Sequence, residues 1–525
     1  MAVGTSLSRL TGFMRLTAMA AAIGITESRL PDAYTIANIT PNIVYELVLG
    51  GILSSVLVPV FVEWMQRRGR DAAWEAARSV FTVAFITLSA IAILGAILAP
   101  WIIRLYTSGV PSADRQATAD LATFFLRWFM PQIVFYGIGA VATGLLNAHR
   151  RFAAPMFAPI LNNLIVIATF ATFVLMPGPP AGSQEVATRA QELVLAIGTT
   201  LGVVAMTFAL WPSLRRTGFR FHWRPRFRDE AVARIARLAG WVVVYVAANQ
   251  IGYLVVIVLA APTQGGYTAY GAAFILFQLP HAIFTVSIVT ALVPSMSARW
   301  ADGDVEGFRA LLARGIRATA VIVIPAALGY LVVGRDIVRL VLEHGESGVQ
   351  SGDLTARMLA FFAIGLFFFS TFQLLLRAFY SMQDTRTPAL INIGALAVNV
   401  GANLLFVFGF DLGVEGLALG HATSYLFSAT LAFLVLRGRL GGIEWRSVGP
   451  SLLRTLVAAG LTGLAAWGTA RLVGDWLGTE TIGDRFVQVF AAVGVGLAVF
   501  LLSALIFRIE EVDTVKRQLL SRRRG

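Results

Sequence analysis

Long apolar runs separated by short loops recur along the whole of this 525-residue chain. A run of about 20 apolar residues is long enough to cross a bilayer as a helix. Hydrophobic residues make up 57% of the sequence and charged residues only 14%, whereas a soluble domain carries about 25% charged residues. Such a chain has too few polar side chains to cover itself in water. The sequence therefore predicts an all-α polytopic membrane protein.

The apolar runs predict fourteen transmembrane helices. They lie at 4–26, 33–64, 77–106, 117–147, 153–177, 191–213, 232–261, 267–298, 308–342, 355–380, 387–409, 413–436, 448–473 and 485–507. Arg9 and Arg15 lie inside the first run and no charged segment precedes it, so a cleaved signal peptide is not predicted.

Charged residues alternate from loop to loop. The basic clusters lie at 67–70, 149–151, 215–228, 437–446 and 516–524, and the other loops are neutral or acidic, apart from a mixed one at 299–306. Because cytoplasmic loops carry an excess of Lys and Arg, both termini are expected on the cytoplasmic side. The net charge of +13 thus reflects topology, and nucleic-acid binding is not predicted.

The sequence lacks common catalytic signatures. It contains no cysteine, which excludes disulfides, thiolate metal sites and cysteine nucleophiles. It also lacks the GxxxxGK(S/T) phosphate loop, the HExxH motif and the GxSxG motif. We therefore expect neither an ATP-driven pump nor an enzyme.

An internal repeat divides the chain. Pro59 recurs as Pro294 and Arg104 as Arg339, each 235 residues later and each with similar neighbours, and the segment 147–155 matches 380–388 at 233 residues. These offsets predict a duplicated unit of six helices. Six is an even number, so both copies enter the membrane from the same side, as in two-lobed transporters that alternate access to a site between the lobes. The chain is expected to comprise four parts: an N-terminal lobe 1–222, a C-terminal lobe 223–437, two extra helices at 438–510 and a basic tail 511–525.

Four stretches carry a family resemblance. The stretch 8–15 reads Ser-Arg-Leu-Thr-Gly-Phe-Met-Arg, and it is joined by motifs within 32–59, 146–159 and 378–388. Together they resemble the MurJ (MviN) family. The resemblance implies the multidrug/oligosaccharidyl-lipid/polysaccharide exporter fold in a bacterial plasma membrane. It also implies that the chain flips lipid II, the undecaprenyl-diphosphate-linked disaccharide-pentapeptide, outward for peptidoglycan synthesis, and that the two extra helices guide its lipid tail.

Arg15 is the main candidate for binding substrate. A helix that starts near residue 4 places it roughly 16 Å deep, where an arginine costs at least ~2.5 kcal/mol unless it meets water or an anion. Ser8, Thr11 and Arg15 share one helical face. With Arg9 they predict a cationic patch for a diphosphate, which guanidinium binds bidentately. The alternatives are a hydrogen bond from Arg15 to carbonyls of a neighbouring helix and an Arg9 side chain that extends to the interface. Arg127 is a weaker substrate candidate, because it can lie near the outer interface.

Further candidates lie on the second and eighth expected helices. The resemblance implies a portal role for Asp32, whose alternative is a helix start. Asn42 follows Pro41, where it can bind ligand or cap a helix break. Glu46 is expected to pair with Arg15 when no substrate is bound. Gln278, close to Pro280, is expected near the substrate.

Four positions depart from the family pattern. Tyr45 and Ile275 stand where many members carry an arginine, Gly50 stands where they commonly carry an acidic residue, and Leu16 stands where an aspartate usually follows Arg15.

A sodium site is a further candidate. The resemblance implies an amide and a carboxylate four residues apart on the eleventh helix, and Asn399 and Asn403 have that spacing without the carboxylate. Thr423 is a weaker candidate ligand. The interpretation that we favour is a set of hydrogen bonds between helices, worth around 0.6 kcal/mol each.

Together these observations predict a monomeric exporter that works by alternating access. Sodium or the membrane potential would drive it, and no other cofactor is expected. Its expected partners are lipid II, membrane lipids and cell-wall synthesis proteins. The alternatives are a drug or cation antiporter, a flippase for another polyprenyl-linked oligosaccharide, and a non-transporting scaffold. An antiporter needs buried carboxylates, and Glu46 is the clearest mid-membrane acid.

Overall fold

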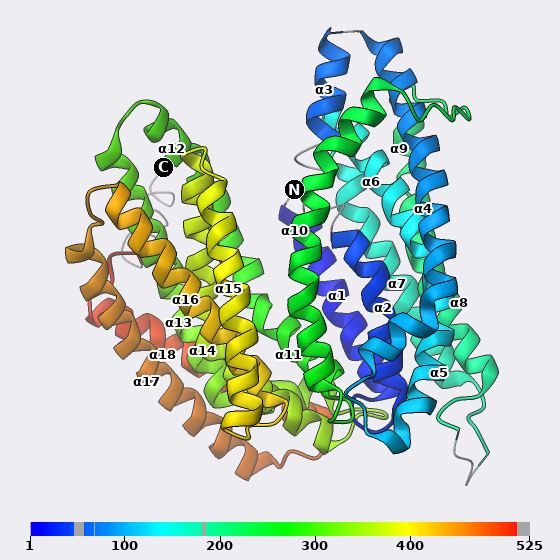
Figure 1. Cartoon of the computed structure of the whole chain (residues 1–525). Coiled ribbons are helices and arrows are strands. Elements are labelled where there is room, and N and C mark those ends of the chain that lie inside the picture. The colour runs from blue at the N-terminus through cyan, green and yellow to red at the C-terminus, as the bar shows by residue number, and fades with distance from the viewer. Residues whose placement is uncertain (1, 47–56, 68, 181–184, 512–525) are drawn as a thin grey trace. The chain divides into compact units, whose positions relative to one another are not determined.

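The computed structural model describes residues 2–46, 57–67, 69–180 and 185–511, and within these ranges it contains helices and no strands (Figure 1). The helices form two compact units. Unit 1 comprises Met1–Thr268 with His344–Ser347, and unit 2 comprises Ala269–Glu343 with Gly348–Gly525. The boundary predicted between 222 and 223 from the repeat stays a prediction.

Ten helices belong to unit 1. They are α1 (Ala2–Ile23), α2 (Leu30–Glu46), α3 (Val58–Arg67), α4 (Arg70–Tyr106), α5 (Ser112–Phe129), α6 (Gln132–Ala148), α7 (Ala153–Leu175), α8 (Arg189–Phe208), α9 (Trp211–Arg215) and α10 (Glu230–Ala260).

Unit 2 holds the later elements, apart from the first turn of α11. They are α11 (Gly266–Pro280), the π-helix η2 (His281–Thr285), α12 (Val286–Ala301), α13 (Val305–Leu342), α14 (Val349–Ser381), α15 (Arg386–Leu404), the π-helix η3 (Leu405–Gly409), α16 (Glu415–Arg439), α17 (Trp445–Leu477) and α18 (Ile482–Ile506).

The all-helical membrane fold is confirmed. In the described part of the chain, eleven helical segments are long and apolar enough to cross a membrane, and they coincide with eleven of the expected runs. The remaining runs, 4–26, 33–64 and 232–261, include residues or side chains outside the described ranges. The total of fourteen spans therefore stays a prediction.

Several helices begin at a capping side chain in a loop. The Asp304 carboxylate accepts the Gly307 N–H at 2.8 Å at the start of α13. This bond and the Arg299 guanidinium hold the pKa of Asp304 below its usual value. Thr188 and Thr481 open α8 and α18 with reciprocal capping bonds. These bonds satisfy N–H groups that the first helical turn leaves without partners.

Aromatic packing fills the core of unit 1 between α2, α5 and α7. The Tyr34 ring packs edge-on against Phe125, Phe129 and Phe170, with ring centroids 5.6 to 5.8 Å apart. Its hydroxyl lies 2.8 Å from the Thr199 hydroxyl of α8, and both side chains are buried. A polar group in an apolar core needs such a partner because no water replaces it.

Small residues let helices approach closely in unit 2. A Cβ atom placed on Gly365 of α14 would lie 2.7 Å from the Cα atom of Ala422 on α16. No side chain fits there, so the glycine permits the contact, as is common between membrane helices.

An ion pair fastens the C-terminal helices to α13. Helices α17 and α18 pack against each other and both contact α13. On α13, the Arg317 guanidinium donates to the Glu511 carboxylate at 2.6 Å and to the Ser447 hydroxyl at 2.7 Å. The side chains of Arg317 and Glu511 are each only 13% exposed. The pair therefore lies in a largely desolvated position.

We predict that Arg317→Met destabilises unit 2. The substitution leaves Glu511 largely buried without its cation, which costs roughly 2 kcal/mol or more. Thermal unfolding of the purified chain in detergent should show a melting temperature lower by several degrees. The matched control is Arg314→Met on the same helix, since Arg314 is exposed and makes no hydrogen bond or ion pair with a described residue. Equal melting temperatures for the two variants would contradict the prediction.

Candidate functional site

The predicted polar face of α1 contacts α7. Asn163 of α7 donates from Nδ2 to the Thr11 hydroxyl at 3.0 Å and to the Ser8 carbonyl at 3.3 Å. Thr11 in turn donates to the Ser8 carbonyl at 3.0 Å. Ser8 and Thr11 therefore join α1 to α7, and the bonds described for Ser8 use its backbone carbonyl.

Arg15 lies on α1 one turn beyond Thr11. Its side chain is half-buried, and its charge acts on the hydroxyl of Tyr136 on α6. Within the described ranges, the Arg15 guanidinium makes no hydrogen bond and no ion pair. The expected alternative, a bond to carbonyls of a neighbouring helix, does not occur among these residues.

Two tyrosines and an asparagine accompany Arg15. The Tyr136 hydroxyl donates to the Asn42 side-chain oxygen at 3.3 Å. The rings of Tyr45 and Tyr136 pack with centroids 4.7 Å apart. Helix α2 continues through Pro41, so Asn42 binds Tyr136 and caps no helix end. We call Arg15, Asn42, Tyr45 and Tyr136 the Arg15 cluster.

The Arg15 cluster contains one of the positions that depart from the family pattern. Tyr45 stands where the resemblance implies an arginine, and its ring covers Tyr136. The departure exchanges a cation for an aromatic ring and a hydroxyl next to Tyr136. Neighbouring hydroxyls can donate to a phosphate oxygen, but they supply no positive charge.

Two other candidates in unit 1 contribute little to this geometry. Arg9 is exposed on α1, in agreement with a side chain that extends to the interface. Glu46 ends α2, and its side chain lies outside the described part of the chain. The pairing of Glu46 with Arg15 therefore stays a prediction.

Asp32 serves as a buried brace in this structure. Its carboxylate accepts the Gly265 N–H at 2.8 Å, the Thr268 N–H at 3.2 Å and the Thr268 hydroxyl at 2.7 Å. Gly265 adopts φ +70°, and a Cβ atom there would lie 2.2 Å from the Ile25 carbonyl oxygen. Asp32 thus connects the first turn of α2 to the N-terminus of α11, and a portal role stays a prediction.

In unit 2, Gln278 lies one turn before the π-helix η2. Its side chain is half-buried and makes no hydrogen bond with a described residue. Pro280 ends α11, and the next residue, His281, contacts the Ser370 hydroxyl of α14 through Nδ1 at 3.1 Å. Ile275, the second departure from the family pattern, is exposed on α11. A π-turn beside a proline leaves backbone carbonyls without helical partners.

The candidate sodium ligands are only partly assembled. Asn403 donates from Nδ2 to the Asn399 side-chain oxygen at 3.1 Å, and both residues are buried. Thr423 instead donates to the Leu419 carbonyl of its own helix at 2.8 Å. The Asn403 oxygen has no donor and faces Gly420, where a Cβ atom would lie only 2.0 Å away. Neutral oxygens can contribute to a sodium site, but this pair offers one oxygen that is not already accepting.

Carboxylates do not gather into a metal site in the described residues. They contain no group of three or more His, Asp or Glu side chains able to hold a metal ion.

The match to a family model assigns this chain to a protein family. The model described as "Lipid II flippase MurJ" matches residues 19–482. The chain belongs to the MurJ family. It is therefore a multi-pass membrane transporter and not an enzyme.

Similar MurJ proteins cover most of the chain. The "Lipid II flippase MurJ" of Burkholderia cenocepacia is 30% identical over 484 residues, which are 90% of this chain and 89% of that protein. The "Probable lipid II flippase MurJ" of Rhizobium meliloti is 28% identical over 83% of this chain and 79% of its own length.

Two solved structures share the fold. A lipid II flippase MurJ in an inward closed conformation has a TM-score of 0.76 at 20% identity and covers 97% of this chain and 99% of its own. An inward-facing multidrug resistance MATE transporter has a TM-score of 0.66 at 16% identity, covering 84% and 98%. At these identities the likeness concerns the fold alone.

Sequence reasoning missed two residues of this MurJ chain, Asn163 and Tyr136. Adjacent amides at 162 and 163 within an apolar run were a usable signal, because such amides need partners inside the membrane. Tyr136 gave no such signal, since a tyrosine in an apolar run is equally typical of an interface.

We predict that Asp32→Asn destabilises the connection between α2 and α11. The asparagine side chain places an NH2 group, which accepts no hydrogen bond, where a carboxylate oxygen of Asp32 accepts one. Each buried donor that is left without a partner costs about 1–3 kcal/mol. Hydrogen exchange should become faster in residues 262–268, with a lower melting temperature. Asp114→Asn is the control, because Asp114 is exposed in the first turn of α5. Unchanged exchange in Asp32→Asn would refute the brace.

Proposed function

We propose that this MurJ-family chain flips lipid II from the inner to the outer leaflet of the plasma membrane, with the substrate diphosphate bound by Arg15. Membership of the family supports the substrate, because the matching model and the relatives at 25–30% identity carry that description. Arg9 contributes at the cytoplasmic end of α1 in this proposal. Asn42, Ser8, Asp32, Glu46 and Gln278 stay candidates for contacts with the rest of the headgroup.

The observation that carries the proposal is that the Arg15 guanidinium makes no hydrogen bond or ion pair with a described residue. An arginine within a membrane helix costs at least ~2.5 kcal/mol unless an anion or water compensates. In the described residues no carboxylate pairs with Arg15, while the Tyr136 hydroxyl is close enough to sense its charge. A diphosphate offers several oxygens to the planar fork of the guanidinium, which binds phosphate bidentately. The site is thus suited to a ligand that brings its own negative charge.

Transport then proceeds by alternating access between two parallel six-helix lobes, 1–222 and 223–437. The duplicated sequence and the parallel direction of its copies support this part of the proposal. Both termini lie in the cytoplasm by the distribution of basic loops. The driving force is the membrane potential or sodium, and Asn399 and Asn403 are the residues to which a sodium ion would bind.

Helices α17 and α18 are proposed to contact the lipid tail of the substrate. Large apolar side chains are exposed on both helices, and they include Leu453, Leu464, Leu472, Phe486, Phe490 and Leu497. The rings of Phe486 and Phe490 stack with centroids 4.1 Å apart. Such a surface is stable against acyl or polyprenyl chains and unstable against water.

We expect Arg15→Ala to abolish complementation in cells depleted of their own lipid II flippase. Loss of a charge-assisted bidentate contact worth about 1.5–3 kcal/mol lowers flipping by roughly ten- to a hundredfold. Arg15→Lys should keep part of the activity, because lysine retains the charge but not the fork. The measurements are growth, protein level in the membrane and lipid II accessible on the outer face.

Arg226→Ala is the matched control, because Arg226 is exposed in the loop before α10. Full rescue by Arg15→Ala would retain the substrate and refute the proposed diphosphate site. Failure of the parent chain to rescue, despite normal membrane levels, would refute lipid II as the substrate and favour a drug or another oligosaccharide lipid. Normal growth with no change in exposed lipid II would indicate a scaffold.

A further inference from the structure

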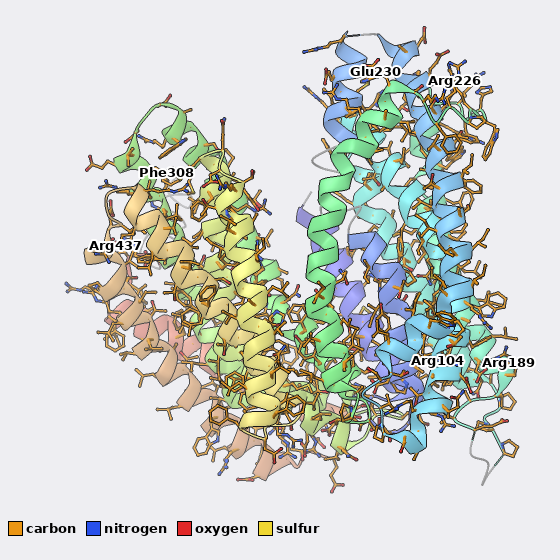
Figure 2. The ribbon with its side chains drawn as sticks, in the orientation of Figure 1. Arg104, Arg189, Arg226, Glu230, Phe308 and Arg437 are labelled. Atoms are coloured by element: carbon orange, nitrogen blue, oxygen red, sulfur yellow. The ribbon has the colours of Figure 1, made fainter. Side chains whose placement is uncertain are left out.

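A second group of arginines surrounds a cavity in unit 1, and none of the residues that line it belongs to the Arg15 cluster. The cavity measures about 500 Å³ and lies between α4, α5 and α8. Its charged lining consists of Arg104, Arg127, Arg189 and Asp120. Figure 2 shows Arg104 and Arg189 at the end of unit 1 opposite Arg226 and Glu230. On the expected topology this is the outer side of the membrane.

Two of these arginines have no anion from the protein. Arg189 pairs with Glu192 at 2.8 Å and lies over the Phe124 ring at 3.8 Å. The Asp120 carboxylate accepts the Gln116 amide at 2.9 Å. Arg104 and Arg127 are exposed, and within the described ranges neither makes a hydrogen bond or an ion pair. The cavity therefore has two guanidinium groups available for an anionic ligand.

The internal repeat shows how the same position is neutralised in unit 2. Arg104 corresponds to Arg339 of α13, which donates to the Thr479 hydroxyl at 2.9 Å and pairs with Glu343 at 3.3 Å. Thr479 follows α17, the helix that packs along α13. In unit 2 the protein itself thus supplies the partners of this arginine. In unit 1 no described residue supplies such a partner to Arg104.

The surface that leads to the cavity indicates what that molecule is. Along α4, large apolar side chains of the turns before Arg104 are exposed, among them Ile93, Leu94, Ile97 and Trp101. In the most apolar 18-residue stretch of α4, only 22% of the residues are buried. Trp101 and the cavity residue Trp128 are both exposed, and tryptophan is typical of the level of lipid headgroups. An apolar helix face that ends at two arginines matches an acyl chain that ends at a phosphate.

We propose that Arg104 and Arg127 bind the headgroup phosphate of a membrane phospholipid, whose acyl chains lie along the exposed face of α4. Guanidinium groups bind phosphate oxygens bidentately, and two of them offset the cost of bringing the phosphate into the cavity. The site is separate from the Arg15 cluster, and it requires only a phosphate on a lipid anchor. The lipid then covers the apolar face of α4 and binds its arginine, as α17 and the loop after it do for α13.

Native mass spectrometry of the full chain, purified in detergent and supplied with defined lipids, tests the proposal. Phosphatidylglycerol and phosphatidylethanolamine should remain bound to the parent. The double variant Arg104→Gln/Arg127→Gln should retain at least tenfold less of both. Diacylglycerol with the same acyl chains should not be retained, and inorganic phosphate alone should not raise the melting temperature.

Two control variants keep the test interpretable. Arg104→Lys/Arg127→Lys keeps the charge and should show intermediate retention. Arg314→Gln/Arg377→Gln removes two exposed arginines from unit 2 and should retain lipid like the parent. A melting temperature of the lipid-free double variant equal to that of the parent shows that it is folded.

Three results would overturn the proposal. Equal retention of phospholipid by the parent and by Arg104→Gln/Arg127→Gln would show that the two arginines do not bind the lipid. Retention of diacylglycerol equal to that of phospholipid would show that the phosphate does not contribute to binding. A response to inorganic phosphate as large as that to phospholipid would replace the lipid by a free anion. Because no lipid II is added, these outcomes are independent of the proposed flippase activity.

Discussion

A guanidinium group inside or at the edge of a membrane needs an anion, and this requirement organises the chain. Arg317 receives its anion from Glu511 and Arg339 receives it from Glu343, and both arginines connect helices within unit 2. Arg15 and Arg104 receive none from the described residues. An arginine that pairs within the protein stabilises the fold, whereas one that does not is a place for a charged ligand. The same side chain thus has either role according to what surrounds it.

The same reasoning separates the other buried polar groups. Asp32 accepts three hydrogen bonds and Asn163 donates two, so both are satisfied by the fold itself. Asn403 donates one bond and keeps a buried oxygen without a donor. A buried polar atom without a partner costs about 1–3 kcal/mol. Satisfied groups therefore belong to the architecture, and incompletely satisfied ones are where ions or substrates would improve the free energy.

Local features were predicted well from the sequence, and features that depend on distant residues were not. The eleven helical segments that are long and apolar enough to cross a membrane follow from apolar runs, which depend only on neighbours along the chain. Asp384 is another local feature, since it accepts the N–H groups of Arg386 and Thr387 at 2.9 and 3.0 Å. These bonds and Arg439 outweigh the effect of burial and lower the pKa of Asp384 to about 2.

The composition of the Arg15 cluster could not be derived in that way. The depth of Arg15 follows from counting residues along one helix, but its partners come from α2 and α6, which lie some 30 and 120 residues away. The brace at Asp32 joins residues 233 and 236 positions apart in sequence. The spacing of apolar residues along the sequence does not predict such contacts, because they depend on which helices pack together. The family resemblance pointed to residues of α1 and α2, whereas the contact of the Tyr45 ring with Tyr136 is visible only in the structure.

The two copies of the repeat show how one sequence pattern acquires two surroundings. Helices α4 and α13 each carry an arginine at the same place near their C-terminal ends. On α13 the neighbouring face is covered by α17 and α18, so the arginine is bonded within the protein. On α4 the corresponding turns remain apolar and exposed. An exposed apolar helix surface of this kind marks a place for lipid or another apolar partner, whereas α13 has α17 and α18 packed against it.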